Sequence, residues 1–391
     1  MILGSNILYR ILNFSTFLYI GSILTLSSIA QLSSLTLLSS IVSFMILIVL
    51  FFKNKRIIIS KFVLLPIILM IYILSSVLWA TKPELALLNA ASYVSLIFGS
   101  IVFLLSLLNG VQKKTIILAL VISSLVLVIS TVIEYMNNSD QTRFGGLLVN
   151  PNSLAIAITI ISISLLYYGK GKLRLTYSFS LLVFVTYFSG SRKILFSWIT
   201  IFIISSFLTI LRKKSLKSIL KIYSTFTIVL VFILILAPTI LQKLEELMVF
   251  KRYEKLVQGN DISSGNIRLN LIDQAKDVWA NNPFFGVGVG QFSTFANGMY
   301  AHNNYLELLA SLGLIGLILY YSIYIWIIQK ATTVKGIEKK VFFISTVFLL
   351  VVWDIALVSY VDKKIWLFII LMIWGLVDQE KDSDIKINRP Y

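Results

Sequence analysis

A single histidine, His302, is present in the 391 residues, in the stretch YAHNNYLELLASLG (residues 300–313). Imidazole is the side chain whose unperturbed pKa lies closest to neutral pH, so it is well suited to accept a proton there. An apolar helix is predicted to begin beside it, and the positive end of the helix dipole favours the neutral imidazole. His302 is therefore a candidate general base. The alternative is a histidine in a helix cap that hydrogen-bonds to the backbone.

Three arginines and a lysine are the candidate cations. Arg143 lies in RFGGLLVNPNSLA (143–155), Arg192 and Lys193 lie in SGSRK (189–193), and Arg268 lies on a predicted helix. Arginine binds phosphate through two parallel hydrogen bonds, so a cluster of arginines suits a diphosphate ligand. The alternatives are snorkelling to lipid headgroups for Arg192 and Lys193, and an ordinary solvated helix charge for Arg268.

Five polar residues are expected to support these groups. Asn150 and Asn152 shape the turn at the start of one predicted helix, and Asn303 lies in the turn at the start of another. Tyr305 is spaced to orient His302 if both share a helix face. Asp354 lies deep in a predicted span, where an ionised carboxylate costs at least about 2.5 kcal/mol unless it is paired. We therefore expect a cation beside it.

Composition places these residues in a membrane protein. The chain is 58% hydrophobic, carries a formal net charge of +17 and contains no cysteine. Its apolar runs are long enough to cross a hydrocarbon core, and its basic residues fall in short clusters between them. Membrane topology explains the charge, so no nucleic-acid partner is expected. With one histidine, no cysteine and no carboxylate pair beside His302, we expect no metal and no cofactor.

The predicted fold class is all-α, a polytopic integral membrane protein with about 12 transmembrane helices in a single transmembrane domain, residues 1–391. Apolar segments lie at 11–30, 33–52, 57–79, 86–108, 115–136, 151–168, 175–190, 193–211, 219–240, 303–329, 341–360 and 364–378. The basic clusters then fall on one side, which places both termini in the cytoplasm. The segment 303–329 is predicted to be one span that holds His302 at the outer membrane surface.

Residues 241–302, between the ninth and tenth spans, are predicted to form one large, partly helical extracytoplasmic loop. An amphipathic helix is expected at 241–258, and a second from near Ser264 to the NNP motif at 281–283. The glycines of FFGVGVGQF (284–292) indicate tight turns. Since no predicted strand precedes them, they are not a dinucleotide-binding motif.

The order of these motifs resembles that of the O-antigen ligase and polysaccharide polymerase superfamily of bacterial envelope proteins. The resemblance is carried by RFGGLLVNPNSLA, SGSRK, SGNIRLNLIDQAKDVWANNPFFGVGVGQF (264–292) and AHNNYLELLASLGLIGL (301–317). It implies an enzyme that transfers a glycan from an undecaprenyl diphosphate carrier to an acceptor hydroxyl at the outer face of the cytoplasmic (inner) membrane. By this resemblance His302 is the base, and Arg192 and Arg268, with Arg143, hold the diphosphate.

The resemblance leaves two activities open. An O-antigen or capsular polysaccharide polymerase joins one lipid-linked glycan to another, whereas an O-antigen ligase transfers the glycan to lipid A core. The Ile-, Lys- and Asn-rich composition favours the polymerase. Membrane lipids and other polysaccharide-assembly proteins are further expected partners. The alternative from another class is a lipid-linked oligosaccharide flippase or other transporter, for which two related halves are expected and are not evident in the sequence.

Overall fold

The structure is a computed structural model that describes most of the chain on either side of residues 204–261. The described residues are 2–29, 32, 34–138, 141, 143–169, 171, 173–191, 193–194, 196–200, 203 and 262–387. The predicted helix at 241–258, the predicted span at 219–240 and most of the predicted span at 193–211 lie outside them.

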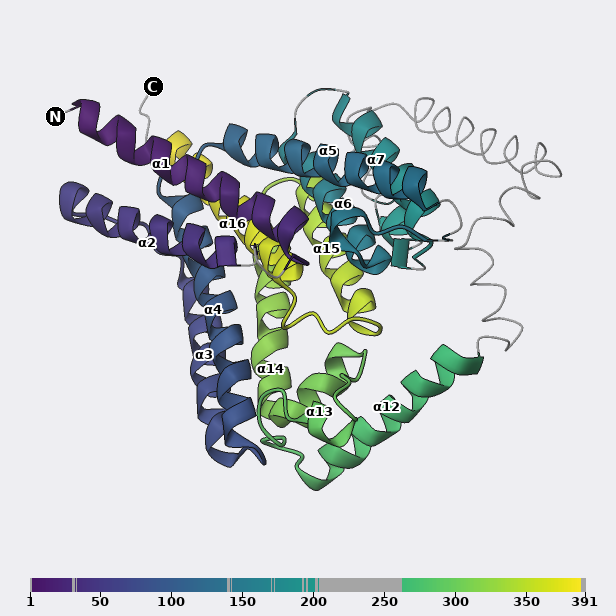
Figure 1. The fold of residues 1–391 in the computed structure, drawn as a ribbon. Helices are drawn as coiled ribbons and strands as arrows, with labels where there is room; N and C mark the ends of the chain where they lie inside the picture. Colours follow the sequence, from purple (N-terminus) through teal and green to yellow (C-terminus); the bar gives the residue numbers. More distant parts are fainter. Residues whose placement is uncertain are drawn as a thin grey trace. The chain divides into compact units, whose positions relative to one another are not determined.

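The described residues form helices and contain no strand, which confirms the all-α prediction for this part of the chain (Figure 1). The α-helices are α1 (Ile2–Gly21), α2 (Ser34–Asn54), α3 (Leu64–Ser75), α4 (Pro83–Leu108), α5 (Lys113–Asn137), α6 (Pro151–Tyr168), α7 (Leu173–Ser189), α12 (Ile262–Asn281), α13 (Phe292–Phe295), α14 (Asn304–Thr333), α15 (Ile337–Asp354) and α16 (Lys363–Ile387). The π-helix η1 (Ser22–Leu26) extends α1. The 3-10 turns η3 (Lys61–Val63) and η4 (Ser76–Trp79) extend the two ends of α3.

Seven helices among the described residues are long and apolar enough to cross a membrane. They are Ile7–Leu26, Ser34–Asn54, Lys61–Trp79, Pro83–Leu108, Lys113–Asn137, Pro151–Tyr168 and Asn304–Thr333. Helix α7 has 17 residues and is shorter than a typical span. The chain is therefore a polytopic membrane protein, while the predicted total of about 12 spans is not confirmed. Helix α15 ends at Asp354 instead of residue 360.

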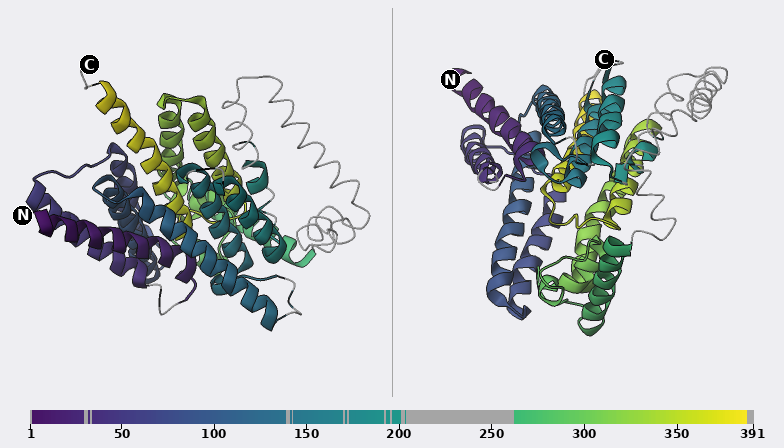
Figure 2. Two further views of the ribbon diagram at one scale, coloured as in Figure 1. Left: turned by 90° about the horizontal axis from the view of Figure 1, so that it is seen from above. Right: turned by 45° about the vertical axis from the view of Figure 1, so that its right-hand side comes forward.

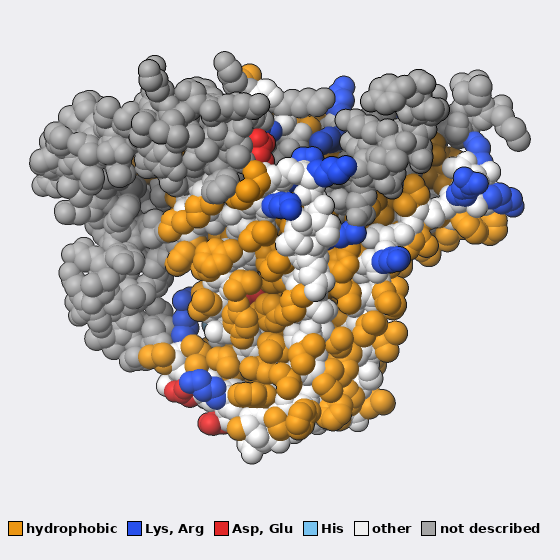
Figure 3. Space-filling view, turned by 180° about the vertical axis from the view of Figure 1, so that it is seen from behind, with side chains coloured by type: hydrophobic (Ala, Val, Ile, Leu, Met, Phe, Trp, Pro, Cys, Tyr) orange, Lys and Arg blue, Asp and Glu red, His pale blue; other side chains and the backbone are white. Residues whose placement is uncertain are grey.

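The described surface is largely hydrophobic. Leu64, Ile71 and Leu78 expose 61%, 58% and 87% of their surface, and all three lie on the segment formed by α3 and η4. Figure 3 shows broad hydrophobic areas on one face of the molecule, with few charged side chains among them. Side chains of this kind are stable at a surface that faces lipid, which agrees with the membrane assignment.

The chain divides into two compact units, and each is described by itself. The first comprises Met1–Ser123, Ser263–Val334 and Leu350–Tyr391, and the second comprises Ser124–Ile262 and Lys335–Leu349. The single transmembrane domain stays a prediction.

In the first unit, helices approach closely at small polar residues. Ser15 Oγ and Ser43 Oγ lie 2.8 Å apart, and Ser22 Oγ and Thr36 Oγ1 lie 3.0 Å apart, so two hydroxyl pairs join the first two helices. Helices α3 and α4 run side by side in Figure 1 and in the right-hand view of Figure 2. In an apolar environment, such close contacts and hydrogen bonds replace the hydrophobic effect as the force between helices.

Helix α14 breaks at Gly313 and folds back on itself. Gly313 has φ 66° and ψ −168°, outside the helical region. Asn304 Nδ2 donates to the Tyr321 hydroxyl over 3.1 Å, and the rings of Tyr305 and Tyr321 stack with centroids 5.0 Å apart. A straight helix rises about 1.5 Å per residue and would separate residues 304 and 321 by roughly 25 Å. The residues before Gly313 therefore lie beside those after it.

The loop of residues 282–291 closes this break. We call residues 304–312 the short half of α14 and residues 314–333 the long half. Four backbone hydrogen bonds join the loop to the two halves: Val287 N to Ala310 O (3.0 Å), Gly288 N to Ser311 O (2.9 Å), Leu314 N to Pro283 O (2.9 Å) and Ile315 N to Phe284 O (3.2 Å). Helix ends leave N–H and C=O groups without intrahelical partners, and the loop satisfies four of them.

The predicted glycine turns are confirmed. Close contacts with backbone atoms also require glycine at two positions, Gly286 and Gly313. Gly286, Gly288 and Gly290 have φ of 67°, 102° and 68°. A Cβ added to Gly286 would lie 2.5 Å from the carbonyl carbon of Ser311, and one added to Gly313 would overlap the carbonyl oxygen of Phe284. No side chain fits at either position without moving the backbone.

We expect Gly286→Ala and Gly313→Ala each to lower the free energy of unfolding by more than about 1 kcal/mol, because alanine disfavours positive φ and its Cβ meets backbone atoms. Thermal unfolding in detergent measures the change. Gly21→Ala is the control, since Gly21 is helical and an added Cβ has nothing within 4 Å. Equal stability of all three variants would contradict the closed break.

Candidate functional site

His302 lies in a turn one residue before the N-cap of α14. The N-cap is Asn303, whose side-chain oxygen accepts a hydrogen bond from Leu306 N over 3.1 Å. His302 has a φ of 52°, a left-handed conformation that histidine adopts more readily than most residues. Its ring packs against Tyr300 with centroids 4.1 Å apart, and Tyr300 is 50% exposed. The imidazole therefore occupies a partly open position.

The fold-back of α14 changes where His302 lies. It is near a helix start, as predicted, but that helix is the short half and not an uninterrupted span. The short half begins beside Tyr321, which lies roughly 12 Å along the long half from Gly313 at about 1.5 Å per residue. The predicted span 303–329 is therefore not one continuous helix, while the position of His302 at the outer membrane surface stays a prediction.

Asn304 is fully buried and ties the start of the short half to two other segments. Its side-chain oxygen accepts hydrogen bonds from Ser359 N (2.9 Å) and Tyr360 N (3.1 Å). Its amide donates to Tyr321, whose hydroxyl in turn donates to Asp354 Oδ2 over 2.8 Å. This hydrogen bond comes from a hydroxyl group, and the cation predicted beside Asp354 stays a prediction. A role for Asp354 in the site stays a prediction.

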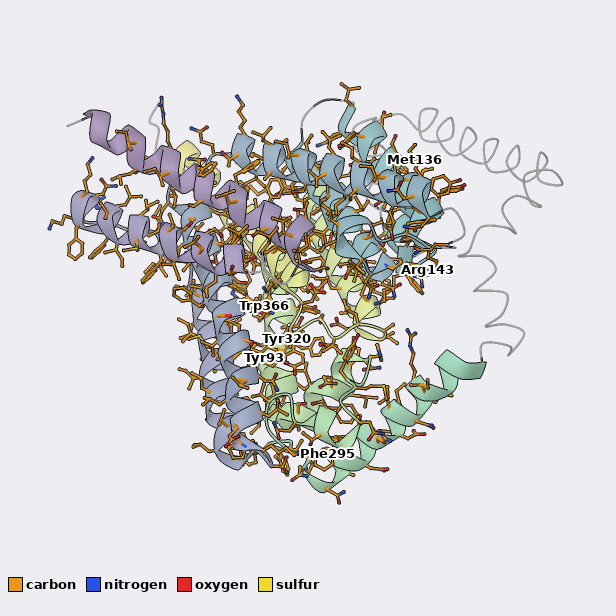
Figure 4. All side chains as sticks on the ribbon, viewed as in Figure 1. Tyr93, Met136, Arg143, Phe295, Tyr320 and Trp366 are labelled. Atoms are coloured by element: carbon orange, nitrogen blue, oxygen red, sulfur yellow. The ribbon has the colours of Figure 1, made fainter. Side chains whose placement is uncertain are left out.

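Aromatic residues pack around Tyr360, one of the two residues that donate to Asn304. Tyr320 lies 6.4 Å from Trp366 and from Tyr360 between ring centroids, and Tyr93 lies 5.6 Å from Tyr360. These rings come from α4, α14, α16 and the connection between α15 and α16, and Figure 4 labels Tyr93, Tyr320 and Trp366. These packed rings hold the segment whose backbone N–H groups, at Ser359 and Tyr360, donate to Asn304.

Arg268 lies on α12, the helix that was predicted to start near Ser264 and that runs from Ile262 to Asn281. Its face is shared with Leu271 and Ala275, three and seven residues on. Those two are buried in a core with Phe292, Ala296, Ala301 and Ala310. Ile267, predicted on this face, is 51% exposed.

The positive charge of Arg268 acts on Tyr300, the residue that packs against His302. Partial burial raises the pKa of the Tyr300 hydroxyl, and the positive charge of Arg268 opposes that rise. Arg268 itself is exposed. Ala301, the residue before His302, packs in one core with Leu271 and Ala275, so the first unit places the helix of Arg268 beside the turn of His302.

Tyr305 has a different environment from the one its spacing predicts. Its hydroxyl donates to Val351 O over 2.9 Å, and its ring stacks on Tyr321. The helical spacing does not apply because His302 lies before the helix. Orientation of His302 by Tyr305 stays a prediction.

Arg143 belongs to the second unit and joins two helices there. Its Nε donates to Ser189 O over 2.8 Å, and its Nη2 donates to Asn152 Oδ1 over 3.1 Å. Asn150 is the N-cap of α6, with its side-chain oxygen accepting from Asn152 N over 2.8 Å. All three residues thus shape the start of α6, and diphosphate binding by Arg143 stays a prediction.

The other two candidate cations are less fully described. Lys193, also in the second unit, is partly exposed, whereas Arg192 lies outside the described residues. The roles predicted for both stay predictions. His302 and Arg268 belong to the first unit, whereas Arg143 and Lys193 belong to the second.

Three further residues of interest were missed from the sequence. Glu307 is buried in the short half and is hydrogen-bonded to Ala301 N over 2.7 Å. Lys363 and Lys364 begin α16, and Lys364 Nζ lies 3.9 Å from Asp362 Oδ1. Lys363 and Lys364 lie at a helix end that the predicted topology places outside, where the positive-inside rule disfavours lysine. This conflict with the rule is a sequence signal that could have identified both lysines. Nothing in the sequence pattern marks Glu307.

No group of three or more histidine, cysteine, aspartate or glutamate side chains in the described part of the chain is arranged to hold a metal ion. The expectation of a reaction without metal or cofactor stays a prediction.

These features define the class of the protein. It is an integral membrane protein with apolar helices, a partly open histidine as candidate base and a nearby arginine as candidate anion-binding cation. Residues 177–321 match the family model described as O-antigen ligase. The matched segment contains Lys193, Arg268 and His302, and Arg143 lies before it. This match supports placing the chain in the O-antigen ligase and polymerase superfamily. No curated protein matches the chain.

We expect Asn304→Ala to destabilise the first unit strongly. The substitution removes the side-chain oxygen to which Ser359 N and Tyr360 N donate, and a buried N–H without a partner costs about 1–3 kcal/mol. Thermal unfolding measures the loss. Asn282→Ala is the control because Asn282 is exposed and makes a long 3.5 Å hydrogen bond. Matching unfolding temperatures would show that the Asn304 network contributes little.

Proposed function

We propose that the protein is a membrane glycosyltransferase that acts on undecaprenyl-diphosphate-linked oligosaccharide repeat units, and that it is an O-antigen or capsular polysaccharide polymerase. The observation that carries the proposal is the match of residues 177–321 to O-antigen ligase, a segment that includes both His302 and Arg268. The choice of polymerase over ligase rests on composition. The proposed location is the bacterial cytoplasmic membrane, with the site on its outer face and both termini in the cytoplasm.

The proposed reaction is an inverting transfer at the anomeric carbon of the donor sugar. His302 accepts the proton of the acceptor hydroxyl as that oxygen bonds to the anomeric carbon. The bond from the anomeric carbon to the diphosphate breaks, and its electron pair leaves with the undecaprenyl diphosphate. Arg268, with Arg192 and Arg143, stabilises the negative charge that grows on the leaving group. The partly open turn at His302 suits approach of an acceptor.

The description of the matching family supports the ligase as the second candidate. Reconstitution in liposomes separates the two. Polymer formed from lipid-linked repeat units alone would establish the polymerase, whereas strict dependence on lipid A core would establish the ligase. Transport of the lipid-linked unit across the bilayer without any new glycosidic bond would replace both with the flippase.

We expect His302→Ala and His302→Asn to lower the rate of glycan transfer by about 100-fold or more, because general-base catalysis contributes at least that factor. The rate is measured with lipid-linked repeat units in liposomes. Asparagine tolerates the left-handed conformation of residue 302, so His302→Asn removes the base with little backbone strain.

Asn297→Ala is the control for His302→Ala. Asn297 also has a positive φ, 50°, and lies exposed in the same connection. We expect this variant to retain the rate. Full transfer by His302→Asn would exclude His302 as the base.

We expect Arg268→Lys to lower kcat/KM for the lipid-linked donor by about 10-fold or more, since a charged hydrogen bond contributes about 1.5–3 kcal/mol and lysine cannot form the paired contact. Lys276→Ala is the control on the same helix, where Lys276 is exposed and pairs with Asp273 at 3.1 Å. An unchanged kcat/KM in Arg268→Lys would count against a two-point diphosphate contact.

A further inference from the structure

Glu307 is a buried carboxylate one turn into the short half of α14. Only 4% of the residue is exposed. Oε2 accepts a hydrogen bond from Ala301 N over 2.7 Å, and Oε1 accepts one from Ser311 Oγ over 3.4 Å. The ion pairs of the described residues do not include Glu307. Burying a carboxyl group is unfavourable unless it is hydrogen-bonded, and these two hydrogen bonds are the described contacts that satisfy Glu307, while Asn303 caps the helix.

Glu307 anchors the turn on both sides of His302. Its carboxylate holds the N–H of Ala301, and its own backbone N–H donates to Asn303 O over 3.0 Å. His302 is the single residue between these two anchors, and its φ is 52°. With both neighbours fixed, the Cα–Cβ direction of His302 is fixed as well, and the ring lies against Tyr300.

The same carboxylate connects this turn to the closed break. Ser311, which donates its hydroxyl to Glu307, also accepts a backbone hydrogen bond from Gly288 N over 2.9 Å. A continuous series of contacts therefore runs from the loop that closes α14, through Ser311 and Glu307, to the residue before His302.

We propose that Glu307 is a positioning residue for the base: by holding Ala301 N–H, it fixes the left-handed backbone of His302 and aims the imidazole at the acceptor hydroxyl. The proposal rests on the proposed function of His302. Glu307 acts through Ala301. Aim matters because a displacement of about 1 Å can cost on the order of 100-fold in rate.

Activity is measured with lipid-linked repeat units and the full chain in liposomes. Glu307→Ala should lower kcat by about 100-fold with KM changed by less than about 3-fold, because orientation and not donor binding is lost. Glu307→Gln keeps an acceptor oxygen and should restore kcat to within about 3-fold of the original value. Glu84→Ala, which removes an exposed carboxylate from the first turn of α4, should leave both constants unchanged.

The lone histidine supplies a readout that does not depend on activity. With 15N-labelled histidine in nanodiscs, every imidazole signal comes from His302. The original protein and Glu307→Gln should each give one sharp set of signals. Glu307→Ala should give broadened or multiple signals, since the ring samples several orientations.

The outcomes separate the two proposals. Unchanged signals and unchanged kcat in Glu307→Ala would overturn the positioning role. If Glu307→Ala does not fold, Glu307→Asp replaces it: a side chain shorter by one methylene should disturb the His302 signals, and unchanged signals would overturn the proposal. Disturbed signals in Glu307→Ala, combined with full activity in His302→Asn, would keep the positioning role and reject the proposed base.

Discussion

The closed break in α14 is the constraint on which the described site depends. A helix interrupted in an apolar environment leaves N–H and C=O groups that neither lipid nor a missing turn can satisfy, so an internal partner is required. The loop of residues 282–291 is that partner, through two N–H donors and two carbonyl acceptors. It can approach because Gly286 and Gly313 carry no side chain. Without this closure, the folded-back arrangement would lose the four hydrogen bonds that satisfy the ends of the two halves.

The folded-back short half explains why residues distant in sequence share one region. Its start is bound through Asn304 to the connection between α15 and α16, and its buried face packs with α12 around Leu271 and Ala275. The first contact holds the turn of His302, and the second brings Arg268 close enough for its charge to act on Tyr300. The turn of His302 and the helix that carries Arg268 are thus parts of one packed arrangement.

Sequence reasoning predicted the elements better than their arrangement. Local signals were sufficient for α12, which ends before Pro283, for the turn at Asn150 that begins α6, and for the tight turns at the three loop glycines. The fold-back was not predictable from pattern, because the apolar residues around Gly313 continue without interruption and the closing loop lies more than twenty residues upstream. Glu307 was missed for a related reason: its partner, Ala301 N, is a backbone group that carries no residue-type signal.

The most direct test of this arrangement is a cross-link between the two halves of α14. The chain contains no cysteine, so Tyr305→Cys combined with Tyr321→Cys introduces the only two thiols. The ring centroids of these residues lie 5.0 Å apart in the folded-back helix, whereas a straight helix would separate the two Cα atoms by roughly 24 Å. A short thiol cross-linker should join the two cysteines within one chain. A chain that stays uncross-linked, with both thiols reactive towards a maleimide, would contradict the fold-back and the position of His302 that follows from it.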